Sequence, residues 1–283
     1  MNERAPAAAA QPFFLPAKAG QRFCLYYAPA GAGCRGAVLY VHPFADEMNK
    51  SRRMAALQAR ALAALGYAVL QVDLYGCGDS SGEFVDARWD IWKDDLARAS
   101  AWLDSKVDAP LILWGLRLGA LLALDYARDA ARKPARMLLW QPVHGGAACL
   151  TQFLRLLSAN AMLAEAGKAA PEKTGGTAAL KASLLDGQAL EVAGYELASE
   201  LAAAIEQLDA AGMAPQGCQV HWLEAVAAAE RPLSPAVERQ AAHWRAQGTA
   251  LQLERVVCPP FWTTQEITVS DALLGATTTI FAA

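Results

Sequence analysis

The sequence predicts an α/β fold in which a mostly parallel sheet is covered by helices on both faces. Strand-like and helix-like segments alternate along most of the 283 residues, which is the pattern of βαβ units. The strand-like segments are short and apolar at nearly every position, as strands are when both faces of a sheet are buried. In residues 111–119 an apolar run enters a glycine-bounded turn, and a helical segment follows. These features indicate one α/β domain with an insertion.

The expected strands are short runs of apolar and β-branched residues bounded by turn formers. They cover residues 22–27, 36–41, 67–72, 111–114, 137–140, 219–225 and 251–257. A turn rich in Gly, Pro and Ala separates the first two strands, and Asp73 ends the third.

The expected helices place apolar residues at intervals of three and four. They cover residues 49–65, 89–103, 120–131, 151–167, 194–211 and 234–247. Gly66 follows the first of them and suits a helix C-cap, because glycine tolerates the left-handed conformation there. The segment 194–211 is expected to be the crossover helix that leads into strand 219–225.

Composition suggests where the domain begins. Residues 1–16 are rich in Ala and Pro, lack a strong apolar centre and are interrupted by Pro12. We therefore expect a disordered tail and not a signal peptide. Residues 1–11 are assigned to this tail, and residues 12–283 to the domain.

The regular alternation lapses between residues 141 and 217. Residues 151–167 look helical, and residues 168–177 read as a polar linker with Pro and Gly. Ligands of open α/β sheets bind outside the carboxyl ends of the strands, and an insertion at this place would cover them. Residues 145–193 are therefore expected to form a helical lid.

Composition and charge exclude several classes of protein. A formal net charge of −3 and a pI near 5.8 offer no broad basic surface for nucleic acid or anionic membranes. No apolar run approaches the ~18 residues that a membrane span requires. The six cysteines and four histidines lack the spacing of metal ligands, so we expect no metal and no cofactor. Scattered cysteines suit reduced thiols and a cytoplasmic location.

The turn Gly115-Leu116-Arg117-Leu118-Gly119 is the most informative motif of the chain. Glycines suit a crowded turn between a strand and a helix, where a Gly-x-Ser-x-Gly sequence would present a serine nucleophile. The central residue here is Arg117. An arginine stays protonated and carries only donors, so it cannot attack a carbonyl carbon. The motif thus has the frame of a nucleophile elbow and a different residue at its centre.

Three segments resemble the α/β-hydrolase superfamily: residues 41–44 (Val-His-Pro-Phe), residues 73–82 (Asp-Leu-Tyr-Gly-Cys-Gly-Asp-Ser-Ser-Gly) and the elbow within residues 114–120. With residues 44–53 and 259–262, the chain closely resembles the second type of exosortase A system-associated hydrolase. That is a bacterial α/β-hydrolase family tied to exopolysaccharide and protein-sorting gene clusters. The resemblance spans roughly residue 12 to the C-terminus, and it implies the α/β-hydrolase fold with a helical lid.

The resemblance also implies where a catalytic triad would lie, in the chain order nucleophile, acid, histidine. The nucleophile position holds Arg117, and the acid position is best filled by Glu224, with Glu230 as second choice. The histidine position falls near residues 258–262, which contain no histidine. The triad is therefore expected to be degenerate, and ordinary serine-hydrolase turnover is not expected.

Two roles for Arg117 follow from its place at a helix N-terminus. Backbone N–H groups of Leu118 and of the 42–44 loop, at Phe44, would form an oxyanion pocket. Arg117 would turn this pocket into a site for a carboxylate, a phosphate or a sugar acid. Alternatively, Arg117 forms a buried ion pair with Glu224 across the empty histidine position. Both alternatives stay open.

Other residues near this edge of the sheet are weaker candidates. Ser80 either supplies a hydroxyl nucleophile or caps its loop. Cys258 is either a reactive thiol activated by Arg117 or an inert buried thiol. His42 either turns into the pocket as a general base or braces its loop by a hydrogen bond.

The charged and aromatic side chains around the predicted pocket either have structural roles or contact a ligand. The cations Lys50, Arg52 and Arg53 are either solvated charges or pair with Asp46, Glu47 or an anionic ligand. The aromatic residues Trp222, Phe261 and Trp262 are expected to pack, or to line an acyl or sugar pocket.

Two functions are compatible with these features. The first is an acyl or ester hydrolase, or an acyl-transfer enzyme, with nonstandard machinery that acts on an acyl or glycan-linked substrate in exopolysaccharide metabolism, as the resemblance implies. The second is a non-catalytic pseudo-hydrolase that binds a small anionic ligand or a partner protein of the exosortase or exopolysaccharide system. A fold alone does not choose between them.

Overall fold

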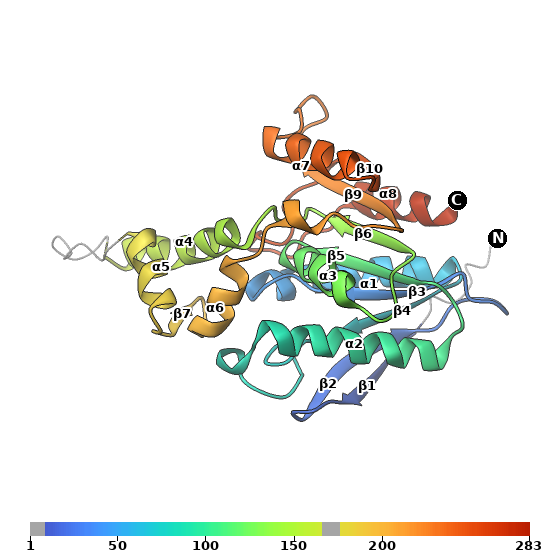
Figure 1. Cartoon of the computed structure of the whole chain (residues 1–283), viewed down its shortest axis with the longest axis horizontal. Coiled ribbons are helices and arrows are strands. Elements are labelled where there is room, and N and C mark those ends of the chain that lie inside the picture. Colours follow the sequence, from blue (N-terminus) through green and yellow to red (C-terminus); the bar gives the residue numbers. More distant parts are fainter. Residues whose placement is uncertain (1–8, 166–175) are drawn as a thin grey trace.

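An eight-stranded sheet runs through the centre of the molecule (Figure 1). The computed structural model describes residues 9–165 and 176–283, the side chains of 158–165 excepted. The strand order is β1-β2-β4-β3-β5-β6-β9-β10; β1–β2 and β2–β4 pair antiparallel, and all other neighbours are parallel. The strands are β1 (Ala10–Pro16), β2 (Gln21–Tyr27), β3 (Gly36–Val41), β4 (Tyr67–Val72), β5 (Leu111–Leu116), β6 (Arg136–Trp140), β9 (Gln219–Val226) and β10 (Ala250–Val257). The predicted, mostly parallel α/β architecture is confirmed.

Helices cover both faces of this sheet and enclose two apolar cores. The helices α2 (Trp89–Lys106), α3 (Leu118–Asp129) and α7 (Pro235–Ala246) supply the first core, and α1 (Asp46–Ala64) and α8 (Asp271–Ala282) supply the second. Strand β5 shows why its sequence is apolar throughout: Leu113 points into the first core, and Ile112 and Trp114 point into the second.

Two elements at the ends of the chain differ from the sequence-based expectation. Residues 10–16, expected to lie in or next to the disordered tail, form β1 and pair with β2, where the Phe13 ring stacks on Trp102 at 4.4 Å. The rest of the expected tail, residues 1–8, lies outside the described residues. Helix α8 was not predicted. It is held by long-range contacts, such as the hydrogen bond from the Trp140 indole to the Thr277 hydroxyl at 2.9 Å.

A cap of small elements stands beyond the carboxyl edge of the sheet, where Figure 1 shows it projecting from the body. It contains α4 (Gly146–Glu165), α5 (Thr177–Leu185), the hairpin of β7 (Leu190–Val192) and β8 (Tyr195–Leu197), and α6 (Ser199–Glu206). Most of the expected linker 168–177 lies outside the described residues. Two single turns of 3₁₀ helix, Phe84–Asp86 and Ala210–Met213, complete the elements.

The predicted single helix over residues 194–211 is wrong. Residues 195–197 pair with β7, and within this range only Ser199–Glu206 is α-helical. The short helix packs into the cap, with Leu201, Ala202 and Ile205 buried. Tyr195 fastens the hairpin to the body, because its hydroxyl accepts a hydrogen bond from Asn49 of α1 at 3.0 Å and its ring contacts Phe84 at 5.1 Å. Within the described residues, no helix combines the length and the apolar character needed to cross a membrane.

Candidate functional site

The turn between β5 and α3 has the strained geometry that the motif predicted. Arg117 is the N-cap residue of α3 and has φ 56° and ψ −121°, a conformation that L-residues rarely adopt. A side chain at Gly115 would collide with the Ala120 Cα, and one at Gly119 would collide with the carbonyl oxygens of Val41 and His42. Both glycines are therefore required by close backbone contact.

Similar strain recurs at neighbouring strand ends. Ala45, before α1, has φ 50° and ψ −128°, and Gln141, after β6, has φ 44°. With Arg117, these residues follow three adjacent strands, β3, β5 and β6, at their carboxyl ends. Strained backbone gathers at functional sites when the surrounding structure holds it in place. The carboxyl edge of the sheet is thus the part of the fold to inspect for a site.

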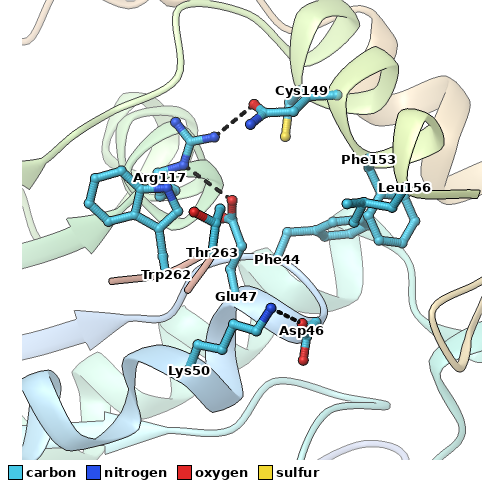
Figure 2. A pocket seen from close by; sticks show the side chains of 11 residues that line it. Phe44, Asp46, Glu47, Lys50, Arg117, Cys149, Phe153, Leu156, Trp262 and Thr263 are labelled. Atoms are coloured by element: carbon cyan, nitrogen blue, oxygen red, sulfur yellow. Dashed lines mark hydrogen bonds and ion pairs between the residues drawn. The ribbon is translucent and has the colours of Figure 1, made fainter. Parts of the chain in front are cut away.

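The Arg117 guanidinium contacts residues from three other parts of the chain (Figure 2). Its Nε donates to Glu47 Oε1 of α1 at 3.3 Å, and its Nη2 donates to Gln152 Oε1 of α4 at 2.9 Å. Its Cζ lies 5.5 Å from the ring centroid of Trp262, which follows β10. The indole stands in the segment where the superfamily pattern would place its histidine.

The ion pair between Arg117 and Glu224, one of the two alternatives for Arg117, is wrong. Glu224 is buried, and its two oxygens accept hydrogen bonds from Gln141 Nε2 at 2.9 Å and from Trp222 Nε1 at 2.8 Å. Burial raises the pKa of this carboxyl, while the two hydrogen bonds and the Arg117 charge oppose the shift. The order of the strands explains this result. Arg117 follows β5, and β3, which leads to Glu47, is the neighbouring strand. Glu224 lies on β9, which is two strands away from β5.

A cavity of about 90 Å³ opens beside the guanidinium. By volume it could hold several water molecules, at about 10–15 Å³ for each. Its lining contains four large apolar side chains: Phe44, Phe153 and Leu156 lie together on one side, and Trp262 lies beside Arg117 on the other (Figure 2). The full lining is Phe44, Asp46, Glu47, Lys50, Arg117, Cys149, Gln152, Phe153, Leu156, Trp262 and Thr263.

The charges that line the cavity cancel in pairs. Lys50 Nζ lies 2.6 Å from Asp46 Oδ2, and Arg117 pairs with Glu47 (Figure 2). The expected pairing of the Lys50 cation with Asp46 is confirmed. Burial raises the pKa of the Glu47 carboxyl, and the Arg117 charge and hydrogen bond act against that rise. Burial, assisted by the Glu47 charge, raises the pKa of the Cys149 thiol to about 12.

Of the two alternatives for His42, the structure shows the one in which the ring braces its loop by hydrogen bonds. Its Nε2 accepts a hydrogen bond from the Leu74 backbone N–H at 3.3 Å, so its Nδ1 carries the proton and donates to the Pro43 carbonyl at 2.8 Å. Burial lowers the pKa of the ring. With both nitrogens engaged within the fold, no basic nitrogen is left to take a proton in the cavity.

Ser80 and Cys258 take the inert alternatives. The Ser80 hydroxyl donates to the Asp73 carbonyl at 2.6 Å and accepts from the Phe23 N–H at 2.9 Å, so it caps the loop after β4. The Cys258 thiol donates to the Pro259 carbonyl at 3.2 Å, and burial raises its pKa. A thiol with a raised pKa is a poor nucleophile at neutral pH, so the reactive alternative for Cys258 is wrong.

Phe44 and Leu118, the expected oxyanion donors, occupy the starts of two neighbouring connections. Leu118 is the first residue of α3, and its N–H therefore has no intrahelical acceptor. Phe44 lies three residues after the end of β3 and lines the cavity. Their oxyanion role stays a prediction.

Gln152 and Cys149 line the cavity and were not predicted as residues of the site. Both lie on α4 in the cap, and nothing in the local pattern indicates which face of that helix meets the elbow. The role of Glu47 was also missed, although it lies three residues after the expected donor Phe44. Among the described residues, no group of three or more His, Cys, Asp and Glu side chains is arranged to hold a metal ion.

Known proteins share this fold. Est1E from Butyrivibrio proteoclasticus, solved with ferulic acid bound, has a TM-score of 0.62 and 14% identity over 95% of this chain and 96% of that one. A highly thermostable carboxyl esterase from Bacillus coagulans in complex with glycerol has a TM-score of 0.57 and 14% identity, covering 87% and 89%. Mouse alpha/beta hydrolase domain-containing protein 10 has a TM-score of 0.54 and 16% identity, covering 87% and 88%.

One family of known proteins matches this sequence over more than half of its length. A search of curated proteins finds no match. Residues 33–211 match the family described as serine aminopeptidase, S33. This match covers more than half of the chain and includes the elbow and most of the cap. The chain therefore belongs to the serine aminopeptidase S33 family and has the α/β-hydrolase fold.

Proposed function

We propose that this protein is a non-catalytic member of the family, which binds a small anionic ligand through Arg117 in the cavity under the cap. The observation that carries this proposal is the guanidinium at the elbow position, beside an open cavity of about 90 Å³. A permanent cation at a helix N-terminus favours a negative group, and it cannot form an acyl intermediate.

The thiol and the hydroxyl that line the cavity are also poorly suited to nucleophilic catalysis. Its described thiol and hydroxyl are Cys149 and Thr263. The Thr263 hydroxyl donates to the Pro260 carbonyl at 3.0 Å, and the Cys149 thiol has a pKa of about 12. Nucleophilic catalysis needs a base within hydrogen-bond reach of the nucleophile. Among the described residues, no imidazole bonds either group.

The cavity suits a ligand that is anionic at one end and apolar at the other. Arg117 supplies donors for a carboxylate or phosphate, and the apolar side chains of the lining, Phe44, Phe153, Leu156 and Trp262, supply contact for an acyl chain or a ring. Est1E, which shares the fold, binds ferulic acid, a molecule with both features.

The test combines a search for turnover with a search for binding. The protein is incubated with a fluorophosphonate probe and with short- to long-chain acyl esters and thioesters, and we expect neither labelling nor turnover. We expect ferulate or phosphate near 100 times its Kd to raise the Tm by about 5 °C. Arg117→Ala should abolish this rise, whereas Arg53→Ala, which removes an exposed arginine of α1, should preserve it. Turnover that survives Arg117→Ala would contradict the proposal.

A second candidate is an acyl or ester hydrolase, or an acyl-transfer enzyme, with nonstandard machinery. The retained elbow geometry favours it, because the Leu118 N–H still stands at a helix N-terminus where an oxyanion would bind. If this is the function, turnover should appear in the same panel and should be lost in Arg117→Ala or Cys149→Ser.

We also propose that the protein acts in the cytoplasm of a bacterium with an exosortase or exopolysaccharide system. The support is the set of family signatures at residues 44–53 and 114–120 and the six free thiols. Deleting the gene should change the amount or composition of exopolysaccharide, and fractionation should place the protein in the cytoplasm. Unchanged exopolysaccharide in the deletion strain would argue against this association.

A further inference from the structure

The Glu47 carboxylate is already paired with the Arg117 guanidinium, which the proposed ligand would need. Figure 2 shows its side chain rising from α1 into the cavity toward Arg117. Little of either side chain is accessible, with 21% of Glu47 and 11% of Arg117 exposed. A ligand anion that reaches Arg117 must therefore share it with Glu47 or displace Glu47.

The contact between these two residues is longer than two other ion pairs of the protein that join an arginine to a buried carboxylate at the sheet. Arg117 Nε and Glu47 Oε1 are 3.3 Å apart, whereas Arg22–Asp95 and Arg52–Asp73 meet at 2.7 and 2.8 Å. Charge-assisted N–H···O bonds are normally about 2.7–2.9 Å long. Glu47 uses one oxygen only, and its Oε2 has no hydrogen-bond partner in the described part of the chain.

The guanidinium also keeps unused donors. Its fork carries five N–H groups, of which the described residues engage one on Nε and one on Nη2. The remaining N–H groups, including both on Nη1, have no acceptor among those residues. A planar carboxylate could therefore form two parallel hydrogen bonds to the guanidinium, whereas Glu47 forms only one, which is long.

We propose that Glu47 is an internal competitor for Arg117, and that the ligand is a monocarboxylate with a small aromatic or branched apolar body whose carboxylate displaces that of Glu47. This inference rests on the proposed function, since it assumes that the cavity binds an anion. The apolar body would lie against Phe44, Phe153 and Leu156, which face the guanidinium from the other side of the cavity (Figure 2).

The charges around the cavity favour a single negative charge on the ligand. The ionisable groups near Glu47 are Arg117, to which it is hydrogen-bonded, Lys50 and Asp46 on its own helix, and the Cys149 thiol on α4. These residues carry two positive and two negative charges in total. A dianion such as a phosphate monoester would bring more repulsion from Asp46 and Glu47 than a monocarboxylate would.

Displacement of Glu47 should make binding depend on pH. Burial already favours the protonated carboxyl, and the Arg117 cation opposes that effect. Once the ligand holds Arg117, Glu47 loses its counter-charge and takes up a proton more readily. Binding coupled to proton uptake becomes tighter as the pH falls, as long as the ligand itself stays ionised.

The test uses benzoate as the probe, benzamide as its uncharged analogue, and calorimetric titration of the full chain. We expect Glu47→Gln to bind benzoate at least about tenfold more tightly than the wild type at pH 8, with little dependence on pH. Arg117→Gln should remove benzoate binding. Benzamide should bind the wild type and Glu47→Gln equally well, because it makes no ion pair.

Asp46→Asn is the matched control. It removes one negative charge from the neighbouring residue of the same helix turn, and that residue contacts Lys50 and not Arg117. Direct competition predicts that benzoate affinity rises in Glu47→Gln alone. An equal rise in Asp46→Asn would show a general effect of charge and would overturn the inference.

The outcomes separate this inference from the proposed function. Benzoate binding that needs Arg117 but is unchanged in Glu47→Gln overturns the competition and leaves the anion site standing. If neither protein binds benzoate, phosphate or ferulate, the proposed function fails together with the inference.

A second measurement applies if Glu47→Gln does not fold. The wild-type affinity for benzoate is then measured at pH 8 and pH 5.5. Tighter binding at pH 5.5 supports proton-coupled displacement, and an equal affinity at both pH values overturns it.

Discussion

At the level of single residues, the elbow depends on backbone contacts that exclude a side chain at Gly119. A Cβ there would meet the carbonyl oxygens of Val41, the last residue of β3, and of His42, and these buried backbone atoms cannot move aside without disturbing the sheet. We expect Gly119→Ala to lower the free energy of unfolding by about 3 kcal/mol or more. Urea unfolding followed by tryptophan fluorescence measures this change.

Gly275→Ala is the control for that substitution. Gly275 lies in the middle of α8, where an added Cβ meets nothing within 4 Å. Alanine has the higher helix propensity, so this variant should be more stable by about 0.5–1 kcal/mol. Equal effects of the two substitutions would show that close packing at the elbow is not what selects glycine.

At the level of elements, a buried ion pair joins β2, α2 and the loop after β4. Arg22 Nε lies 2.7 Å from Asp95 Oδ1, with side chains 2% and 0% exposed, and Asp95 Oδ2 accepts from the Tyr75 N–H at 2.8 Å. Asp95→Ala should lower the free energy of unfolding by about 3–5 kcal/mol, because it leaves the buried Arg22 charge unpaired. Chemical denaturation measures the loss.

Two further variants test that explanation. The double variant Arg22→Met with Asp95→Leu removes both charges and should regain most of the lost stability. Asp94→Ala breaks the exposed pair with Arg98 on the same helix and should cost about 0.5 kcal/mol or less. If the double variant is no more stable than Asp95→Ala, the stranded charge is not the cause.

At the level of the whole molecule, the buried ring of His221 on β9 affects how stability depends on pH. The residue is 5% exposed, neither ring nitrogen has a partner among the described residues, and burial lowers its pKa to about 4. The unfolded ring takes up a proton below about pH 6.5 while the folded ring stays neutral, so the wild type loses stability as the pH falls from 6.5 toward 4. His221→Leu should remove this loss.

The stability gained by His221→Leu over the wild type should therefore be about 2 kcal/mol larger at pH 5 than at pH 8. Asp95 acts in the opposite direction: burial raises its pKa to about 6, so its ionisation lowers the free energy of unfolding as the pH rises from about 4 to 6. Comparing the two proteins at each pH cancels that effect. A gain of equal size at pH 5 and pH 8 would contradict the assignment to His221.

The sequence by itself determined the body of the fold. The predicted strands 36–41 and 67–72 coincide with β3 and β4, because a six-residue apolar run buried on both faces is recognisable without its neighbours. The elbow was equally readable, since glycines on both sides of a turn between a strand and a helix indicate a crowded backbone, although the contact that excludes a side chain at Gly119 comes from distant Val41 and His42. Helix α8 was missed because its threonines at 277–279 weaken the helical pattern, and packing of Phe281 on Tyr67 compensates.

The tertiary structure alone decided which residue balances Arg117. Glu224 was the expected partner, and Glu47 is the one observed. Both carboxylates lie far from Arg117 along the chain, so local pattern cannot rank them. The order of the strands ranks them, because β3 pairs directly with β5, and β9 is separated from β5 by β6. The position of Gln152 likewise depends on how the cap packs over the sheet edge, which no local preference in its sequence determines.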